Sequence, residues 1–270
     1  MRIDEIAARG LVLLGCGRMG SALLGGWLNG GIAPEAVHVL EPRPSAWLKR
    51  TGVTLNGELP EDPAVLVVAV KPQILIEAVE EVLAYGGGSS LVISIAAGTP
   101  IAAFETAFGP GTPVVRAMPN TPAAVGSGIT ALFGNEAVSE DAYETAETLL
   151  SAVGQVIGLD AEDQMDAVTA VSGSGPAYVF HLIEALAAAG EAEGLSPDLA
   201  LILARATVAG SGALAEIAGE DPAVLRENVT SPGGTTAAGL GVLMDEAAGL
   251  RPLIARTVAA AAARSRDLRQ

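Results

Sequence analysis

Short apolar runs alternate with helical patterns along the first half of the chain. Strands are predicted at residues 11–14, 37–40, 53–55, 65–70, 91–95, 113–118 and 129–133. Helical spacing is found at residues 18–28, 44–50, 73–83 and 139–153. Strands that are apolar throughout and separated by helices are typical of a parallel sheet covered on both faces. We therefore predict an α/β domain of the Rossmann type, built on a parallel sheet.

The strand pattern stops near Asp160. Beyond it, helices are predicted at residues 161–171, 176–193, 197–217, 222–228, 236–248 and 251–268. Ser196-Pro197 and Asp221-Pro222 each combine a capping side chain with a proline suited to a first helical turn. The sequence thus divides into an α/β domain, 1–160, and an all-helical domain, 161–270.

Composition and charge narrow the class of protein. The chain has 270 residues, of which 50% are hydrophobic and 3% aromatic, and its formal net charge is -16. Such an acidic chain argues against nucleic acid or an anionic membrane as a partner. A single cysteine excludes an internal disulfide and fits the reducing cytoplasm. Two histidines and one cysteine argue against a zinc site. We expect no signal peptide at residues 1–5 and no membrane span.

A glycine motif follows the first predicted strand and opens the first predicted helix. It consists of Gly15, Cys16, Gly17, Arg18, Met19 and Gly20 and matches G-x-G-x-x-G. In that context the motif predicts a dinucleotide site, with a tight turn, close approach of the pyrophosphate, and close helix–strand packing. The cysteine is interpreted as a small residue tolerated in the turn, and Arg18 either touches a phosphate or is simply solvated.

The end of the second predicted strand leaves the form of the cofactor open. Glu41 lies 21 residues after Gly20, where an acidic residue can bind ribose hydroxyls, which favours NAD. Arg43 lies two residues further on and could meet a 2′-phosphate, which favours NADP. Both NADH and NADPH therefore remain candidates.

The ends of two later predicted strands, at residues 70–73 and 94–98, should line the nicotinamide half of the groove. Ligands bind beyond the carboxyl ends of parallel strands. Lys71 ends one of these strands, and we favour a positioning role over acid catalysis for it. Asn120 lies in a rigid loop between two prolines, where it could hold a carboxamide or cap a turn.

The segment Thr230-Ser231-Pro232-Gly233-Gly234-Thr235-Thr236 combines a proline, two glycines and a hydroxyl pair ahead of a helical pattern. Thr235 or Thr236 is a plausible N-cap. Free amides at a helix start, together with the helix dipole, favour an anion such as a carboxylate or phosphate. A plain capped turn is the alternative.

Several segments occur in an order that resembles the pyrroline-5-carboxylate reductase family. They are V-K-P-Q at 70–73, M-P-N-T-P at 118–122, D-A-V-T at 166–169, S-G-S-G-P-A-Y at 172–178 and S-P-G-G-T-T at 231–236. The resemblance extends from about residue 11 to residue 268. It implies NAD(P)H-dependent reduction of 1-pyrroline-5-carboxylate to L-proline, and a helical domain that interleaves with a second subunit to share the active site. A homodimer follows, with a larger assembly of dimers left open.

The resemblance also implies site residues. The cofactor would contact the glycine motif and Asn56, Ala69, Val70, Lys71, Pro72, Ala97 and Asn228. The substrate would lie against Glu162, Thr235 and Thr236. Gly20 stands where many members have Ala, a difference that we expect to be harmless for helix packing.

Reduction of a protonated cyclic imine is mainly a positioning task, so a strong enzyme acid is unnecessary. The amides of Gly233 and Gly234, with those of the two threonines, would bind the carboxylate. The Thr236 hydroxyl would meet the ring nitrogen as the catalytic group. One alternative is a hydroxy-acid dehydrogenase, which would need a lysine in the helical domain, whereas Lys49 and Lys71 both lie in the first domain. A dinucleotide-sensing regulator is the other alternative.

Overall fold

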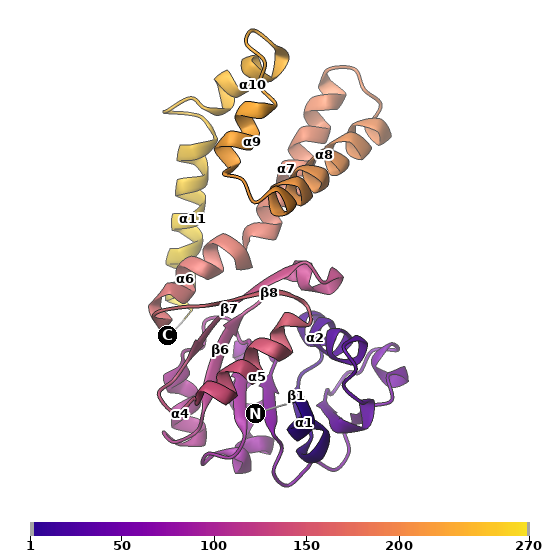
Figure 1. Ribbon diagram of the computed structural model, residues 1–270, viewed down its shortest axis with the longest axis vertical. Helices are drawn as coiled ribbons and strands as arrows, with labels where there is room; N and C mark the ends of the chain where they lie inside the picture. Colours follow the sequence, from indigo (N-terminus) through magenta and orange to yellow (C-terminus); the bar gives the residue numbers. More distant parts are fainter. Residues whose placement is uncertain (1–2, 269–270) are drawn as a thin grey trace. The chain divides into compact units, whose positions relative to one another are not determined.

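The computed structural model describes residues 3–268 (Figure 1). The prediction that residues 1–5 are not a signal peptide falls partly on Met1 and Arg2, which lie outside the described residues. The chain forms two compact units. The first comprises Met1–Gly173 and Ala262–Gln270, and the second comprises Ser174–Ala261. These two units are defined by how the chain packs. The division into a cofactor domain, 1–160, and a substrate and dimerisation domain, 161–270, concerns function and stays a prediction.

The first unit is built on one eight-stranded sheet. Its strands are β1 (Leu11–Leu14), β2 (Val37–Leu40), β3 (Thr54–Leu55), β4 (Val65–Val68), β5 (Leu91–Ser94), β6 (Val114–Met118), β7 (Gly128–Gly134) and β8 (Gly154–Gly158). Their order is β3-β2-β1-β4-β5-β6-β7-β8. The first six strands follow the Rossmann order, in which the strand sequence reverses between β1 and β4.

The predicted parallel sheet is confirmed, with the exception of one antiparallel pair. β6 and β7 are antiparallel, with Met118 opposite Ala131, whereas the other neighbouring strands are parallel. The connection between them holds only a 3-10 turn, η5 (Thr121–Val125). A parallel pair needs a crossover of a dozen or more residues, and this connection is shorter. The strand β8 was not predicted, because its five residues include two glycines and a glutamine and do not form an apolar run; three of the five are exposed.

Helices and turns cover the sheet. They are α1 (Ile3–Arg9), α2 (Arg18–Asn29), η1 (Pro34–Ala36), η2 (Leu48–Arg50), η3 (Pro72–Ile74), α3 (Leu75–Val79), η4 (Glu80–Tyr85), α4 (Ile101–Phe108) and α5 (Glu140–Ser151). The predicted helix at 44–50 is reduced to η2, and the one at 73–83 is broken into 3-10 and α segments. α1 and α4 were not predicted.

Each face of the sheet carries its own core. Leu11 and Leu13 of β1 pack on the face that includes Trp27 of α2. Val12 and Leu14 pack on the opposite face with Phe104 of α4. Alternation of side chains along a strand explains this division. A sheet buried on both faces has apolar residues at every position, as the strand prediction assumed.

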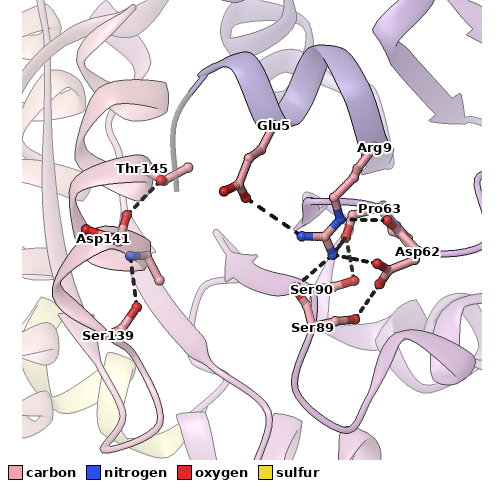
Figure 2. A network of polar contacts seen from close by, with 10 residues as sticks. Glu5, Arg9, Asp62, Pro63, Ser89, Ser90, Ser139, Asp141 and Thr145 are labelled. Carbon is pink, nitrogen blue, oxygen red and sulfur yellow. Dashed lines mark hydrogen bonds and ion pairs between the residues drawn. The ribbon is translucent and has the colours of Figure 1, made fainter.

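A polar network joins α1 to the loops that precede β4 and β5 (Figure 2). The Arg9 guanidinium donates to the carbonyls of Asp62, Pro63 and Ser89 at 3.0–3.2 Å. It also forms an ion pair with the Asp62 carboxylate at 3.0 Å, and Ser89 Oγ donates to that carboxylate. The network ties α1 to the amino ends of β4 and β5, whereas the candidate site lies at the carboxyl ends of these strands.

The segment after β8 continues the first unit through η6 (Glu162–Gln164), α6 (Met165–Val168) and the π-helical turn η7 (Thr169–Gly173). The single helix predicted at 161–171 is therefore interrupted. Asp166 is buried and accepts a hydrogen bond from the buried Ser265 Oγ at 2.7 Å. The end of the chain is thus packed into the first unit.

The second unit is helical, as predicted. It holds α7 (Gly175–Ala192), α8 (Pro197–Ala218), α9 (Pro222–Asn228), α10 (Thr235–Leu243) and the first part of α11 (Leu250–Asp267). Ser196 and Asp221 cap α8 and α9 through their side chains, which confirms both predicted starts. α7 and α8 pack through Ala187, Ala200 and Ala204. Among residues 3–268, α8 is the one helix with the length and apolar composition of a membrane span, and 11% of its apolar window is buried.

Candidate active site

Glycine is required at two positions of the loop between β1 and α2. Gly15 has φ +89°, and a Cβ there would lie 2.9 Å from the Ala69 carbonyl oxygen. A Cβ on Gly20 would lie 2.5 Å from the Gly15 carbonyl oxygen. The loop could accommodate alanine at position 20 only by shifting its backbone. Glycine at position 20 therefore suits this loop geometry, and nothing here contradicts the expectation that the difference from Ala is harmless in this chain.

Gly17 is open where the other two glycines are enclosed. It is the N-cap of α2, it is exposed, and no atom lies within 4 Å of the position of a Cβ. No described side chain caps the amides of the first turn of α2. Bare amides and a cradle that a Cβ would fill are what a pyrophosphate needs, so the loop fits a dinucleotide.

The side chain of Glu41 returns to this loop. Its Oε2 accepts from the backbone N–H of Cys16 at 2.9 Å, and its Oε1 accepts from the N–H of Arg43 at 2.9 Å. The Asn56 side chain accepts from the Glu41 N–H and donates to the Glu41 carbonyl, at 2.8 Å and 3.0 Å. Three predicted cofactor residues, Cys16, Glu41 and Asn56, are therefore joined directly.

The Cys16 thiol is buried, which raises its pKa. A hydrogen bond with Ser21 Oγ acts in the opposite direction, and the nearby charge of Glu41 raises the pKa further. A thiol that holds its proton is a weak nucleophile. The structural role expected for Cys16 is consistent with this chemistry. Arg18 is exposed and Met19 half-buried in the first turn of α2.

The ends of β4 and β5 lie at the same edge of the sheet as the glycine loop. Ala69 donates its N–H to the Leu14 carbonyl at 2.8 Å, so its backbone lies beside the end of β1. Val70 is half-buried, Lys71 is exposed, and Pro72 begins η3. Ala97 follows β5 and is exposed. The structure thus brings these predicted residues to one edge, beside the switch between β1 and β4.

Asn120 is used within the fold. It is buried, its Oδ1 accepts from the Ile129 N–H at 2.9 Å, and its Nδ2 donates to the Ser172 carbonyl at 3.3 Å. These bonds fix the connection from β6 to β7 against η7. These hydrogen bonds match one of the two roles that the sequence allowed for Asn120, that of holding a turn, the other being a contact with the cofactor.

Arg116, a buried residue of β6, was not singled out from the sequence. Its Nη1 donates to Glu162 Oε1 at 2.7 Å, and its side chain is 4% exposed. The same oxygen accepts from the Ile101 N–H at the start of α4, at 2.9 Å. Arg116 is the one charged residue in the strand predicted at 113–118, and this isolated charge is the sequence signal that could have identified it. Neither bond uses Glu162 Oε2.

The proposed substrate loop belongs to the second unit. Gly233 has φ +70°, and Gly234 is the N-cap of α10, so the prediction of a threonine N-cap is wrong. The extended backbone of Gly234 allows its carbonyl to accept from Ala238 N–H, which starts the helix one residue early. Thr235 and Thr236 are exposed in the first turn. Asn228 is exposed at the end of α9.

No group of three or more histidine, cysteine, aspartate or glutamate side chains within residues 3–268 is placed to hold a metal ion. In the first unit, the polar groups of the candidate site are the amides at the start of α2 and the carboxylates of Glu41 and Glu162.

Two family models match the chain. Residues 162–268 match the model for pyrroline-5-carboxylate reductase dimerisation. Residues 10–98 match the model for coenzyme F420-dependent NADP oxidoreductases. The second match covers the strands that carry the glycine loop, Glu41 and Lys71.

Whole-chain relatives agree with these matches. A pyrroline-5-carboxylate reductase from Synechocystis sp. is 43% identical, over 96% of this chain and 97% of its own. The solved pyrroline-5-carboxylate reductase from Coxiella burnetii is 35% identical, with a TM-score of 0.91 over 97% of this chain and 99% of its own. The Plasmodium falciparum enzyme, solved with NADP bound, is 31% identical, with a TM-score of 0.83 over 97% and 98%. The chain belongs to the pyrroline-5-carboxylate reductase family.

Proposed function

We propose that this chain reduces 1-pyrroline-5-carboxylate to L-proline with NADH or NADPH, the last step of proline biosynthesis. The observation that carries the proposal is the open glycine cradle at Gly17, beside the switch point of the sheet, in a whole-length member of this family. The cofactor, when bound, supplies a hydride from nicotinamide C4 to the imine carbon.

The first unit holds the cofactor in this proposal. The amides at the start of α2 bind the pyrophosphate, because Gly17 permits its close approach. The strand ends after β4 and β5, with Lys71 and Ala97, position the nicotinamide. Asn120 keeps the adjoining loop in place, and Asn228 of the second unit is a further cofactor contact. Correct positioning of two reactants can supply about 7–11 kcal/mol of barrier reduction.

The loop of the second unit binds the substrate in this proposal. The amides of Gly233, Gly234 and Thr235 bind the carboxylate, since the positive end of the α10 dipole favours an anion. The Thr236 hydroxyl hydrogen-bonds the ring nitrogen as the imine becomes an amine, and is the catalytic residue. Glu162 contributes Oε2, the oxygen left over by Arg116 and Ile101.

We propose a homodimer formed through the helical region. Large apolar side chains are exposed on it, including Ile202 at 63% and Val242 at 74%. The match to a dimerisation model over 162–268 supports a second copy of the chain as the group that covers them. A cytoplasmic location and the absence of membrane and nucleic-acid partners belong to the same proposal, which leaves the number of dimers in the assembly open.

The test follows oxidation of NADH and NADPH at 340 nm in parallel, with 1-pyrroline-5-carboxylate as substrate. We expect turnover with at least one cofactor, and formation of proline equal to the cofactor consumed. Binding of a cofactor without oxidation of either one would favour a dinucleotide-sensing regulator and overturn the proposal. Light scattering of the same sample measures the assembly, and a monomer would overturn the homodimer.

A further inference from the structure

Glu41 lies where NADH and NADPH differ. The two cofactors are distinguished at the adenosine 2′ position, which carries a hydroxyl in one and a phosphate in the other. An acidic residue at the end of the second strand binds the ribose hydroxyl, whereas an arginine accommodates the phosphate. The chain has both residue types, Glu41 and Arg43, so spacing alone does not decide between them.

The backbone of Glu41 is held by Asn56. Two hydrogen bonds join the Asn56 carboxamide to the N–H and the carbonyl of Glu41, and the Asn56 N–H donates to the Val39 carbonyl at 2.9 Å. Asn56 has φ +49°, a left-handed conformation that asparagine tolerates better than most residues. The side chain of Asn56 is thus engaged with Glu41, as a positioning residue.

The carboxylate of Glu41 is also held. One oxygen accepts from the Cys16 N–H in the glycine loop, and the other accepts from the Arg43 N–H. Each carboxylate oxygen can accept two hydrogen bonds, so each keeps an acceptor position. A fixed pair of acceptors beside the pyrophosphate cradle is suited to the hydroxyls of a ribose.

Arg43 differs in this respect. Its side chain is exposed, and within residues 3–268 its guanidinium forms no hydrogen bond or ion pair. An unheld arginine must lose side-chain freedom before it can bind a phosphate. The contact of Arg43 with Glu41 is made by its backbone N–H, which donates to the carboxylate and so helps to hold it.

We propose that Glu41, positioned by Asn56 and by the amides of Cys16 and Arg43, makes this chain select NADH over NADPH. The inference rests on the proposed function for the identity of the reaction. The ribose 2′-hydroxyl of NADH can donate to Glu41. The 2′-phosphate of NADPH would bring a second negative charge next to the Glu41 carboxylate, and the two groups would repel each other. Phosphate and carboxylate oxygens are both acceptors, so no hydrogen bond would form between them.

The experiment measures dissociation constants of NADH and NADPH by cofactor fluorescence with the full-length protein, without substrate, and then kcat/KM with substrate. For the native chain we expect NADH to bind at least about tenfold more tightly than NADPH. Equal or tighter binding of NADPH overturns the inference. If NADH binds selectively but no substrate is turned over, the proposed function fails and the inference stands.

Variants test the assigned residues. Glu41→Gln removes the charge and keeps an acceptor, and we expect the preference for NADH to fall about tenfold. Asn56→Ala should weaken NADH binding more than NADPH binding. Asn56→Asp keeps the hydrogen bond from the Glu41 N–H and should restore part of the preference for NADH.

Glu35→Gln, at the opposite end of β2, is the matched control and should leave the ratio of the NADPH and NADH dissociation constants unchanged. An unchanged ratio in Glu41→Gln overturns the assignment. If a variant fails to fold, the native ratio still decides the preference.

Discussion

The guanidinium of Arg116 and the carboxylate of Glu162 form an ion pair, with 2.7 Å between Nη1 and Oε1. Arg116 is buried in β6, and Glu162 begins the turn that follows β8. The pair therefore links β6 to the turn after β8, across the one strand, β7, that lies between β6 and β8 in the sheet. It also leaves Oε2 of Glu162 unused by these bonds, which gives one side chain a structural and a proposed substrate-binding role.

Replacing Glu162 separates these roles. Glu162→Ala should destabilise the fold, because it leaves the buried guanidinium of Arg116 without its ion-pair partner. The loss should be at most about 3 kcal/mol, because the position of Glu162 is only half-buried and water can replace the carboxylate there. Glu162→Gln keeps an acceptor for Arg116 and Ile101, so we expect a smaller loss of stability and a raised KM for the substrate. Urea denaturation and steady-state kinetics measure the two effects. A Glu162→Gln protein with native KM would contradict the substrate role.

Removal of the Thr236 hydroxyl should affect catalysis and leave the cofactor in place. We expect Thr236→Ala to lower kcat/KM for 1-pyrroline-5-carboxylate by about 10- to 100-fold, the effect of losing one hydrogen bond worth about 1–3 kcal/mol. NADH binding, measured by fluorescence, should be native. Thr106→Ala removes a hydroxyl that bonds only within α4 and is the control. Native turnover in Thr236→Ala would exclude this residue as the catalytic group.

Alanine at the two glycines of the α2 start should have opposite consequences. At Gly17 the added Cβ meets open space and φ is −70°, so we expect native stability but weakened cofactor binding. At Gly20 the Cβ meets the Gly15 carbonyl oxygen, so we expect a loss of about 1–3 kcal/mol of stability. Thermal unfolding in the absence of cofactor separates the two. Cofactor binding of native strength in Gly17→Ala would contradict the proposed pyrophosphate cradle.

Asp62 makes stability depend on pH at the edge of the sheet. The hydrogen bond from Ser89, with the bonds from Arg9, lowers the pKa of this carboxyl below its ordinary value of 3.8. Its contribution is present above about pH 4 and is lost as pH falls through the lower, folded-state pKa. Asp62→Asn should therefore unfold with a weaker dependence on pH below about 4. Glu61→Gln, which removes the neighbouring charge, is the control. Parallel pH curves for Asp62→Asn and the native protein would refute this account.

The positions of β1 to β7 were predictable from the sequence, because a sheet covered on both faces requires apolar residues at consecutive positions, whereas β8 has no apolar run. The reversal at β7 was not, since strand direction depends on the length and path of a connection and not on residue type. The breaks in the helix predicted at 73–83 likewise reflect how the segment packs on the sheet, which periodicity does not report.

The candidate site shows the same division. The glycine motif and Glu41 were found because the chemistry of a phosphate and of a ribose requires those residue types near those positions. The bond from Cys16 to Glu41, the clamp by Asn56 and the ion pair of Arg116 join residues 15 to 46 positions apart. Contacts at such separations follow from the assembled fold, and the spacing along the chain does not encode them.

The packing of Ser265 against Asp166 makes the helical unit an insertion. The chain leaves the first unit after Gly173 and returns to it at Ala262, so both ends of the inserted helices are covalently anchored to the same unit. A chain shortened before Ala262 would lose part of the nucleotide-binding unit as well as helical surface. A single cut between α8 and α9, by contrast, would leave each fragment with its own attachment to that unit.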